Sequence, residues 1–246
     1  MTEFKFPSEM VDLPSKGLLY PEGSTLASGS IEMKYMTAKE EDILTNQNYI
    51  RKGVVIDKLL QSLIISDINY EDLLIGDKDA ILIASRILGY GKEYKFLFSG
   101  EEIEVDLTTL KEKPLDESLI LKPRKNEFEY TLPHSGNKIT FKLLSQKDDT
   151  NIDKEIEGYK KISKEENKEL TTRLKFMILS VNGDSERSTI NNFVDTAFLA
   201  RDSKSFRDYY NKINPGIDTK IKYEFLEGIE EDLDIPINMN FFWPDA

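Results

Sequence analysis

The chain of 246 residues contains no cysteine and a single histidine, His134. The missing cysteine excludes disulfides and catalysis by a thiol. A structural zinc site draws its four ligands mainly from cysteine and histidine, so we expect no tightly bound metal and no cofactor. A Ser–His–acid site would depend entirely on His134, which follows Pro133 in a predicted turn and reads as a surface residue.

Positive charge is also scarce, with 33 Lys and Arg against 45 Asp and Glu, a net charge of −12. Nucleic-acid binders neutralise phosphates with clustered basic residues, and the densest basic stretch, 122–125, reads as a solvated linker. We therefore expect no nucleic-acid partner. No apolar run approaches the roughly 18 residues that span a bilayer, and residues 1–10 do not resemble a secretory signal. We expect a soluble protein with no membrane partner, which stays in the compartment where it is made.

One pattern occurs twice in the chain. Residues 28–44 read SGSIEMKYMTAKEEDIL and residues 135–152 read SGNKITFKLLSQKDDTNI. With Ile31 placed on Ile139, the next ten residues pair without a gap. Both copies alternate apolar and polar residues like a half-buried strand, and both continue with the hydroxyl-to-acid spacing of a helix capping box. Because further matches occur in the same order at both ends of each half, an internal duplication is favoured over chance recurrence.

The order of predicted elements extends this parallel over the whole chain. Each half begins with a Leu-Pro turn and a strand, continues with helices, and closes on a β-hairpin. In the first half these are an extended arm at 13–24, a strand at 31–35, helices over 38–64 and 77–88, and a hairpin over 94–107. In the second half they are a strand at 139–144, helical faces over 170–181, 190–198 and 202–210, and a closing segment at 223–237.

The predicted fold class is therefore α+β, built from two related halves. Residues 1–110 form the first half with its N-terminal arm, and residues 128–246 form the second. Between them, residues 111–127 are charged and carry Pro114 and Pro123, which is typical of a linker.

Two acidic pairs are the candidates for chemistry, Glu40–Glu41 and Asp148–Asp149. Neighbouring carboxylates can act as a general acid and base, so a hydrolase that uses these pairs is one hypothesis. Each pair also lies in the first turn of a predicted helix, where a carboxylate interacts favourably with the helix dipole. This simpler explanation favours a protein that is not an enzyme. GDKDA at Gly76 and GYGK at Gly89 lack the other residues of calcium-binding and phosphate-binding loops.

The chain closes on IPINMNFFWPDA, with three consecutive aromatic residues followed by a proline. Chain ends are usually polar and frayed, so these aromatics must pack against the protein itself or against a partner, and the sequence leaves both open. We expect residues 235–242 to run as a strand beside the second hairpin, with part of the cluster available to a partner. The candidate partner-binding residues are Phe241, Phe242, Trp243 and Pro244.

Several phrases resemble the baseplate hub proteins of T-even-type contractile-tailed bacteriophages and their marine relatives. They are LPSKGLLYPEG, IEMKYMTAKEEDILT, VIDKLLQSLI, IGDKDAILIASRILGYG and the terminal FFWP, and the likeness is strongest from Leu13 to Tyr94. The resemblance implies a structural or assembly protein of the tail baseplate hub, which binds other tail proteins. It also implies assembly in the host cytoplasm and a place in the virion.

Two further points follow from this resemblance. Many relatives carry Cys-x-x-Cys pairs in the hairpin region, which suggests a zinc ribbon, whereas the matching stretches here, YKFLFSGEE and YEFLEGIEE, have no cysteine. Hydrophobic packing must therefore hold these hairpins. Some members are hub subunits and others are assembly factors, so a transient chaperone absent from the mature virion remains an alternative, and self-association is left open.

Overall fold

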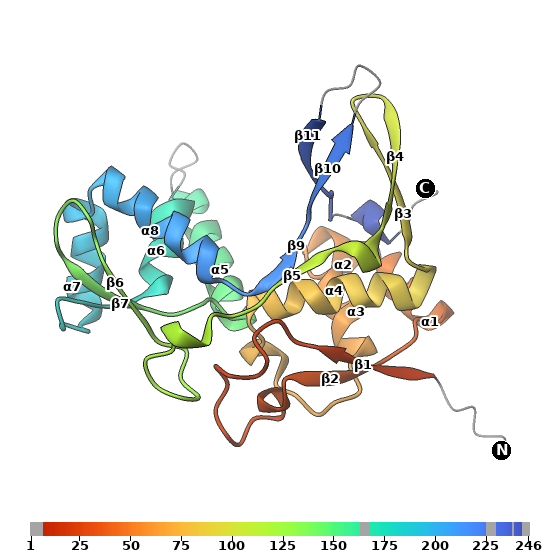
Figure 1. Ribbon diagram of the computed structural model, residues 1–246, viewed down its shortest axis with the longest axis horizontal. Helices are drawn as coiled ribbons and strands as arrows, with labels where there is room; N and C mark the ends of the chain where they lie inside the picture. The colour runs from red at the N-terminus through yellow and green to blue at the C-terminus, as the bar shows by residue number, and fades with distance from the viewer. Residues whose placement is uncertain (1–6, 163–167, 225–229, 238, 243–246) are drawn as a thin grey trace.

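The computed structural model describes residues 7–162, 168–224, 230–237 and 239–242, and it has a mixed α+β fold. Its strands are β1 (Ser8–Asp12), β2 (Ser30–Lys34), β3 (Glu93–Phe98), β4 (Glu101–Asp106), β5 (Lys111–Lys113), β6 (Phe128–Thr131), β7 (Lys138–Phe141), β8 (Ile178–Val181), β9 (Gly216–Asp218), β10 (Lys220–Glu224) and β11 (Glu230–Asp234). Its helices are α1 (Ala38–Leu44), α2 (Gln47–Arg51), α3 (Val55–Leu63), α4 (Ile75–Tyr90), α5 (Gln146–Ile162), α6 (Glu169–Met177), α7 (Arg187–Asn192) and α8 (Ala200–Ile213). Two lobes lie side by side, and two hairpins project from them (Figure 1).

In the first lobe, β1 and β2 form an antiparallel pair, β1 contacts α4, and α3 packs against both α1 and α4. The alternation predicted for β2 is confirmed, because Ile31 and Met33 are fully buried while their neighbours are partly exposed. A third extended segment follows α3, where Met33 forms an antiparallel bridge with Ile64. The strand pair thus contributes Ile31 and Met33 to the core of this lobe.

The second lobe is built on the antiparallel sheet β6-β7-β8. The predicted inward residues Ile139, Phe141 and Leu143 are all buried, and Phe206 of α8 packs edge-on against Phe141 with ring centroids 5.0 Å apart. One expectation is wrong here: the helix predicted over 170–181 ends at Met177, and Ile178–Val181 forms β8. The β-branched residues of this stretch suit a strand, and pairing with β7 decides the outcome.

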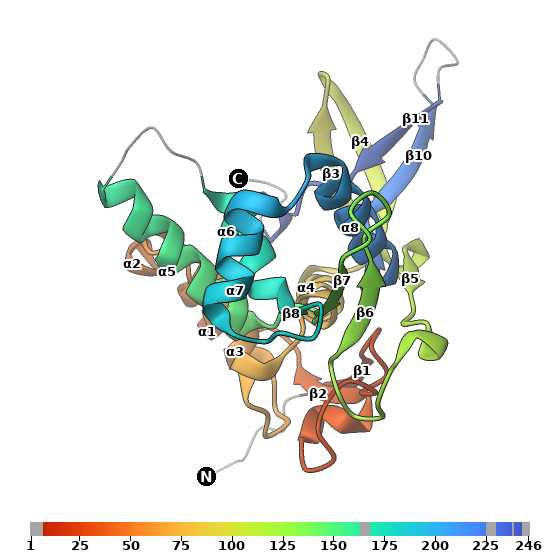
Figure 2. The same ribbon diagram turned by 90° about the vertical axis from the view of Figure 1, so that its left-hand side faces the viewer.

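Both predicted hairpins are confirmed, as β3–β4 and β10–β11. The first is closed by Ser99 and Gly100, whose positive φ values of 50° and 87° fit a two-residue turn. The two hairpins project side by side in both views (Figures 1 and 2). The Tyr94 hydroxyl donates to the Pro236 carbonyl at 3.1 Å, and Tyr94, Ile103 and Leu233 are buried. A hairpin from each half therefore contributes to shared packing.

The segment expected to be a linker takes part in the fold. Strand β5 pairs antiparallel with β9, which follows α8, and Leu115 is buried. Arg124 donates from one guanidinium nitrogen to the carbonyls of Gly17 and Ala27 at 2.8 and 3.1 Å. These contacts join the segment to the N-terminal turn region and to strand β9.

The two lobes also meet directly through backbone atoms. The Ile75 amide donates to the Leu144 carbonyl at 3.0 Å, and the Gln146 amide donates to the Leu73 carbonyl at 2.8 Å. At the start of α4, a Cβ added to Gly76 would lie 1.7 Å from the Pro215 carbonyl oxygen. Only glycine permits this approach, so the absence of a side chain at Gly76 allows the start of α4 to pack closely against Pro215.

Candidate functional site

The C-terminal aromatic residues, the predicted partner site, are held inside the molecule. Phe241 and Phe242 have no exposed surface, and Phe241 packs edge-on against Tyr94 of β3 with ring centroids 4.8 Å apart. Met239–Phe241 forms a 3-10 turn. The expected strand over 235–242 is therefore wrong in the described residues, and Phe241 contacts the first hairpin.

A buried arginine explains this placement. Arg86 of α4 is 1% exposed, and its Nε donates to the Phe241 carbonyl at 2.8 Å. The rest of the guanidinium donates to the carbonyls of Gly91 and Glu93 at 2.9 and 3.2 Å. A planar guanidinium can serve several carbonyls at once, so Arg86 ties the end of α4, the start of β3 and the C-terminal segment together. The apolar pattern of the sequence around Arg86 did not predict that its side chain binds these carbonyls.

The partner-binding role of the aromatic cluster accordingly stays a prediction. The side chains of Phe241 and Phe242 contribute to the core and offer no surface to a partner in this conformation. Trp243 and Pro244 lie outside the described residues. The sequence left self-packing and partner binding open, and for the two phenylalanines the fold favours self-packing.

The acidic pairs occupy matched positions at the starts of α1 and α5. The Glu40 carboxylate accepts from the Thr37 amide at 3.1 Å, from the Thr37 hydroxyl at 2.6 Å and from Lys34 Nζ at 2.8 Å. The Asp148 carboxylate accepts from the Ser145 amide and hydroxyl at 3.0 and 2.9 Å, and from Lys142 Nζ at 2.7 Å. The predicted caps are thus confirmed, each with a lysine from the preceding strand segment.

These contacts determine what the first acid of each pair can do. Burial raises the pKa of Glu40, but hydrogen bonds from Lys34, Thr37 and Ser62 outweigh it and lower the pKa to about 2. A carboxylate with so low a pKa is a poor general acid or base at neutral pH. Its oxygens are already occupied by structural donors.

The second acid of each pair is also engaged. Glu41 is exposed and accepts from the Tyr90 hydroxyl at 3.2 Å, whereas Asp149 forms an ion pair with Arg173 at 3.0 Å. The geometry at both helix starts is that of a capping box extended by a lysine, which stabilises a helix N-terminus.

Two further carboxylates, which the sequence reading missed, hold the Leu-Pro turns. Asp77 is the third residue of α4 and accepts from the Ser15 amide at 2.9 Å, the Ser15 hydroxyl at 2.6 Å and the Tyr20 hydroxyl at 2.6 Å. Asp202 is the third residue of α8 and accepts from the amides of His134 and Ser135 at 2.8 and 3.0 Å. Both aspartates have no exposed surface. Asp77 belongs to the GDKDA stretch, which lacks the other residues of a calcium-binding loop and here holds a turn instead.

The two anchors differ in electrostatics. Burial raises the pKa of Asp77 despite its three hydrogen bonds, and burial beside this carboxylate also raises the pKa of Tyr20. Burial acts in the same direction on Asp202, but hydrogen bonds from Ser135 and His134 outweigh it and lower the pKa. In each arrangement the hydrogen bonds of the carboxylate position a turn.

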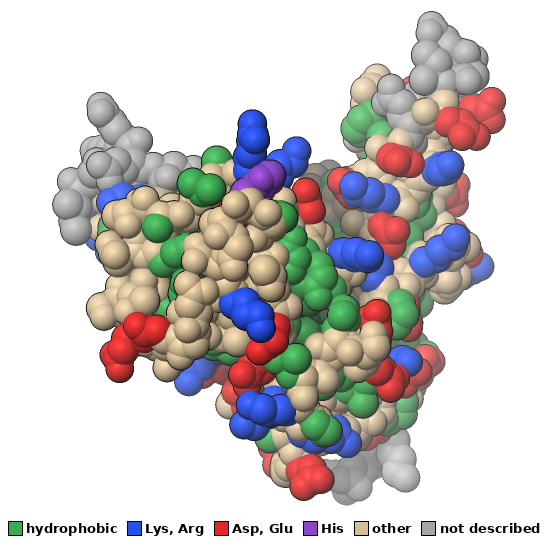
Figure 3. Space-filling model, turned by 60° about the vertical axis from the view of Figure 1, so that its left-hand side comes forward, with side chains coloured by type: hydrophobic (Ala, Val, Ile, Leu, Met, Phe, Trp, Pro, Cys, Tyr) green, Lys and Arg blue, Asp and Glu red, His purple; other side chains and the backbone are tan. Residues whose placement is uncertain are grey.

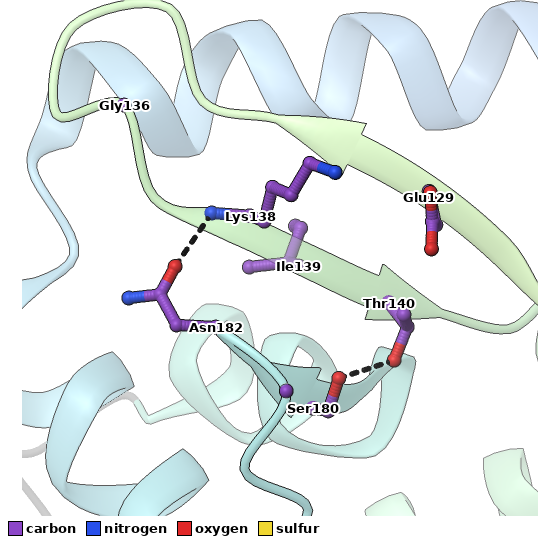
Figure 4. A pocket seen from close by; sticks show the side chains of 8 residues that line it. Glu129, Gly136, Lys138, Ile139, Thr140, Ser180 and Asn182 are labelled. Carbon is purple, nitrogen blue, oxygen red and sulfur yellow. Dashed lines mark hydrogen bonds between the residues drawn. The ribbon is translucent and has the colours of Figure 1, made fainter.

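A shallow polar cavity of about 480 Å³ lies over the β6-β7-β8 sheet. In the close view, Lys138, Ile139 and Thr140 of β7 line it together with Ser180 of β8 (Figure 4). The Thr140 and Ser180 hydroxyls are 2.6 Å apart and bonded to each other. Each hydroxyl is therefore the hydrogen-bond partner of the other.

His134 is exposed at the surface, where basic side chains lie near it (Figure 3). Only its backbone amide takes part in the anchor described above. Within residues 7–162, 168–224, 230–237 and 239–242, no three His, Asp or Glu side chains gather as metal ligands do. Every helix of those ranges is too short or too polar for a bilayer span.

Comparison of the chain with models of known protein families, with curated proteins and with solved structures found no match.

Proposed function

We propose that the protein is a structural or assembly component of the baseplate hub of a contractile tail, and that it acts by binding other proteins. The observation that carries this proposal is the use of its buried carboxylates. Glu40, Asp148, Asp77 and Asp202 all accept hydrogen bonds that position turns and helix starts. Residues that an acid–base enzyme would keep available are committed here to holding a scaffold.

The second part of the proposal is that the chain arose by internal duplication. Several features support it. Each half runs through a strand, a Leu-Pro turn, a strand, a capped helix, a further segment paired to the second strand, an anchored helix and a hairpin. In each half the capping acid bonds a lysine six residues before it, and the anchoring aspartate is the third residue of its helix. This ordered set of contacts favours duplication over the chance recurrence of a strand pattern.

Two similar halves would suit a hub for a geometric reason. A chain with two related surfaces can contact neighbouring subunits of a symmetric assembly in similar ways. The phrases between Leu13 and Tyr94 that resemble phage hub proteins point to the same setting. In that setting the protein would be assembled in the host cytoplasm and carried in the virion.

Quantitative mass spectrometry of purified phage tails that should contain this protein tests the proposed function. A hub subunit is expected in a fixed ratio to the other baseplate proteins. The alternative, a transient assembly chaperone, predicts that the protein is required for tail formation but absent from finished tails. Normal tail assembly without the gene would contradict both.

A hydrolase that uses the acidic pairs makes a different prediction, and alanine variants separate it. For Glu40→Ala and Asp148→Ala we expect a loss of about 1 kcal/mol of folding stability at each helix start, measured by urea unfolding. If these variants instead kept their stability and lost a hydrolytic activity, the scaffold proposal would fail.

A further inference from the structure

A cavity of about 550 Å³ opens where the two halves of the molecule meet. Its lining comes from helices α3, α4 and α5 and from the chain segments that follow α8 and β11. This volume lies in the range of sites that enclose a small ligand or a few side chains of a partner. It is distinct from the anchored turns and from the polar cavity over the β6-β7-β8 sheet.

Most of the lining is apolar. Ile56 and Leu82 come from α3 and α4, Ile217 comes from β9, and Ile235 follows β11. Phe242, which has no exposed surface, lies behind these residues. Aliphatic walls of this kind favour an apolar occupant, because covering them removes hydrocarbon surface from water.

Four charged groups lie in or beside this cavity, and three of them are paired. Lys78 Nζ is 2.6 Å from Asp57 Oδ1 and donates to Gln146 Oε1 at 2.7 Å. Asp149 is held by Arg173. Asp79 is the remaining one, and in the described part of the chain it has neither a hydrogen bond nor an ion pair.

Asp79 is only partly exposed to solvent, which is unfavourable for a carboxylate without a partner. Burial raises its pKa to about 6; Lys78 acts against this shift and Asp77 adds to it. A desolvated charge without a partner costs free energy. A cation placed against Asp79 would recover that cost, and nothing else in the described lining is free to supply one.

We propose that this groove binds a short segment of a partner protein in which a lysine or arginine is flanked by aliphatic side chains, with its cation on Asp79. The long hydrocarbon stem of a lysine or arginine suits the isoleucine walls, and its charged head suits the carboxylate. A divalent metal fits poorly, because it needs several oxygen ligands and Asp79 is the single unpaired carboxylate of the described lining. The proposal deepens the protein-binding function above by naming the chemistry of one contact.

The direct test uses small probes on the full chain, followed by NMR of Ile δ1-methyl groups. Hexylammonium combines the stem and the charge, and hexanol has the stem alone. We expect saturable shifts of Ile56, Ile217 and Ile235, and hexylammonium should bind about tenfold more tightly than hexanol. Asp79→Asn should remove this preference while leaving hexanol binding unchanged.

The matched control is Asp153→Asn, which neutralises an exposed carboxylate on α5 and should leave hexylammonium binding unchanged. Methyl spectra of each variant without probe verify the fold, and Asp79→Ala serves as a second variant. A blocked pentapeptide, Ala-Ile-Lys-Leu-Ala, should likewise bind about tenfold more tightly than the same peptide with norleucine for lysine.

Several outcomes would overturn the proposal. Equal binding of hexylammonium and hexanol would remove the role of Asp79. Shifts of these methyls with protein concentration alone would indicate a second copy of the chain as the occupant. If only a chain shortened to end at Phe242 bound the probes, the protein's own residues 243–246 would be the occupant. These probes do not involve tails, so a failure of the probes to bind would not contradict the hub function. Likewise, absence of the protein from the hub would not contradict binding in this groove.

Discussion

The two halves of the molecule fix the same kind of turn with the same residue at the same helix position, but with different donors. Asp77 accepts from two hydroxyls and one amide in a fully buried setting, and burial raises its pKa. Asp202 accepts from two amides, one of them from the exposed His134, and hydrogen bonds lower its pKa against the effect of burial. Equivalent geometry therefore does not imply equivalent energetics.

The difference follows from the length of the two turns. In the first half the chain from Leu13 to Ser28 is long enough to bring Tyr20 beneath α4, where its hydroxyl also accepts from the Leu74 amide at 2.9 Å. In the second half Thr131 and Lys138 are separated by a short turn that offers mainly backbone amides. The first anchor thus carries more of the packing between turn and helix, and it should be the more sensitive to substitution.

The largest effect is expected from Gly76→Ala, which would break the junction between the halves. The new methyl would lie 1.7 Å from the Pro215 carbonyl oxygen, and a backbone atom cannot rotate away. We expect a loss of more than about 4 kcal/mol in the free energy of unfolding or no folded protein. Gly158→Ala in α5 is the control, since nothing lies within 4 Å of its added Cβ, and it should stabilise by about 0.5–1 kcal/mol. Chemical denaturation of both variants decides this.

The next effect sharpens the assignment of the C-terminal segment to the first half. Phe241→Ala removes a fully buried ring from its contact with Tyr94 but keeps the backbone carbonyl that accepts from Arg86, and we expect a loss of about 3–5 kcal/mol. Leu97→Ala on the same hairpin is the control, because Leu97 is 75% exposed and should change stability by less than about 0.5 kcal/mol. Calorimetry that gave equal melting temperatures for the two variants would contradict the packing described.

A smaller effect compares the anchors themselves. Asp77→Ala leaves buried hydroxyls of Ser15 and Tyr20 without their acceptor, and we expect a loss of about 3 kcal/mol. Asp202→Ala exposes two amides near the surface, where water can replace the carboxylate, so its loss should be smaller. Hydrogen exchange should quicken at Ser15 in the first variant and at His134 and Ser135 in the second. An equal loss in both would show that the hydroxyl donors add nothing.

The smallest effect is a pH dependence at the first capping box. The pKa of Glu40 falls from 4.5 when unfolded to about 2 when folded. Its contribution to stability is therefore complete above about pH 4.5 and is lost as the pH falls towards 2. Glu40→Gln should flatten the unfolding free energy over this range, whereas Glu41→Gln on the exposed side should not. Identical profiles for the three proteins would refute the assignment.

Local features were readable from the sequence because their partners are close along the chain. The Thr37–Glu40 spacing predicted a capping box, and the pattern of residues 94–107 predicted a hairpin. Residues that depend on distant partners were not readable: Arg86 meets Phe241 across 155 positions, and β5 gains its strand character only from β9. The anchoring role of Asp77 was missed for the same reason, since its donors belong to a turn that precedes it by 57 and 62 positions.

The tie between Arg86 and Phe241 also bears on how the chain is made. At about 5–20 residues per second, a ribosome needs roughly 8–30 s to advance over the 155 positions between them. During that interval the first hairpin and the end of α4 lack the Phe241 ring, and Tyr94 lacks its packing partner. The nascent chain should therefore be open to premature association on this side until Phe241 emerges, so the order of synthesis leaves this part of the core exposed for longest.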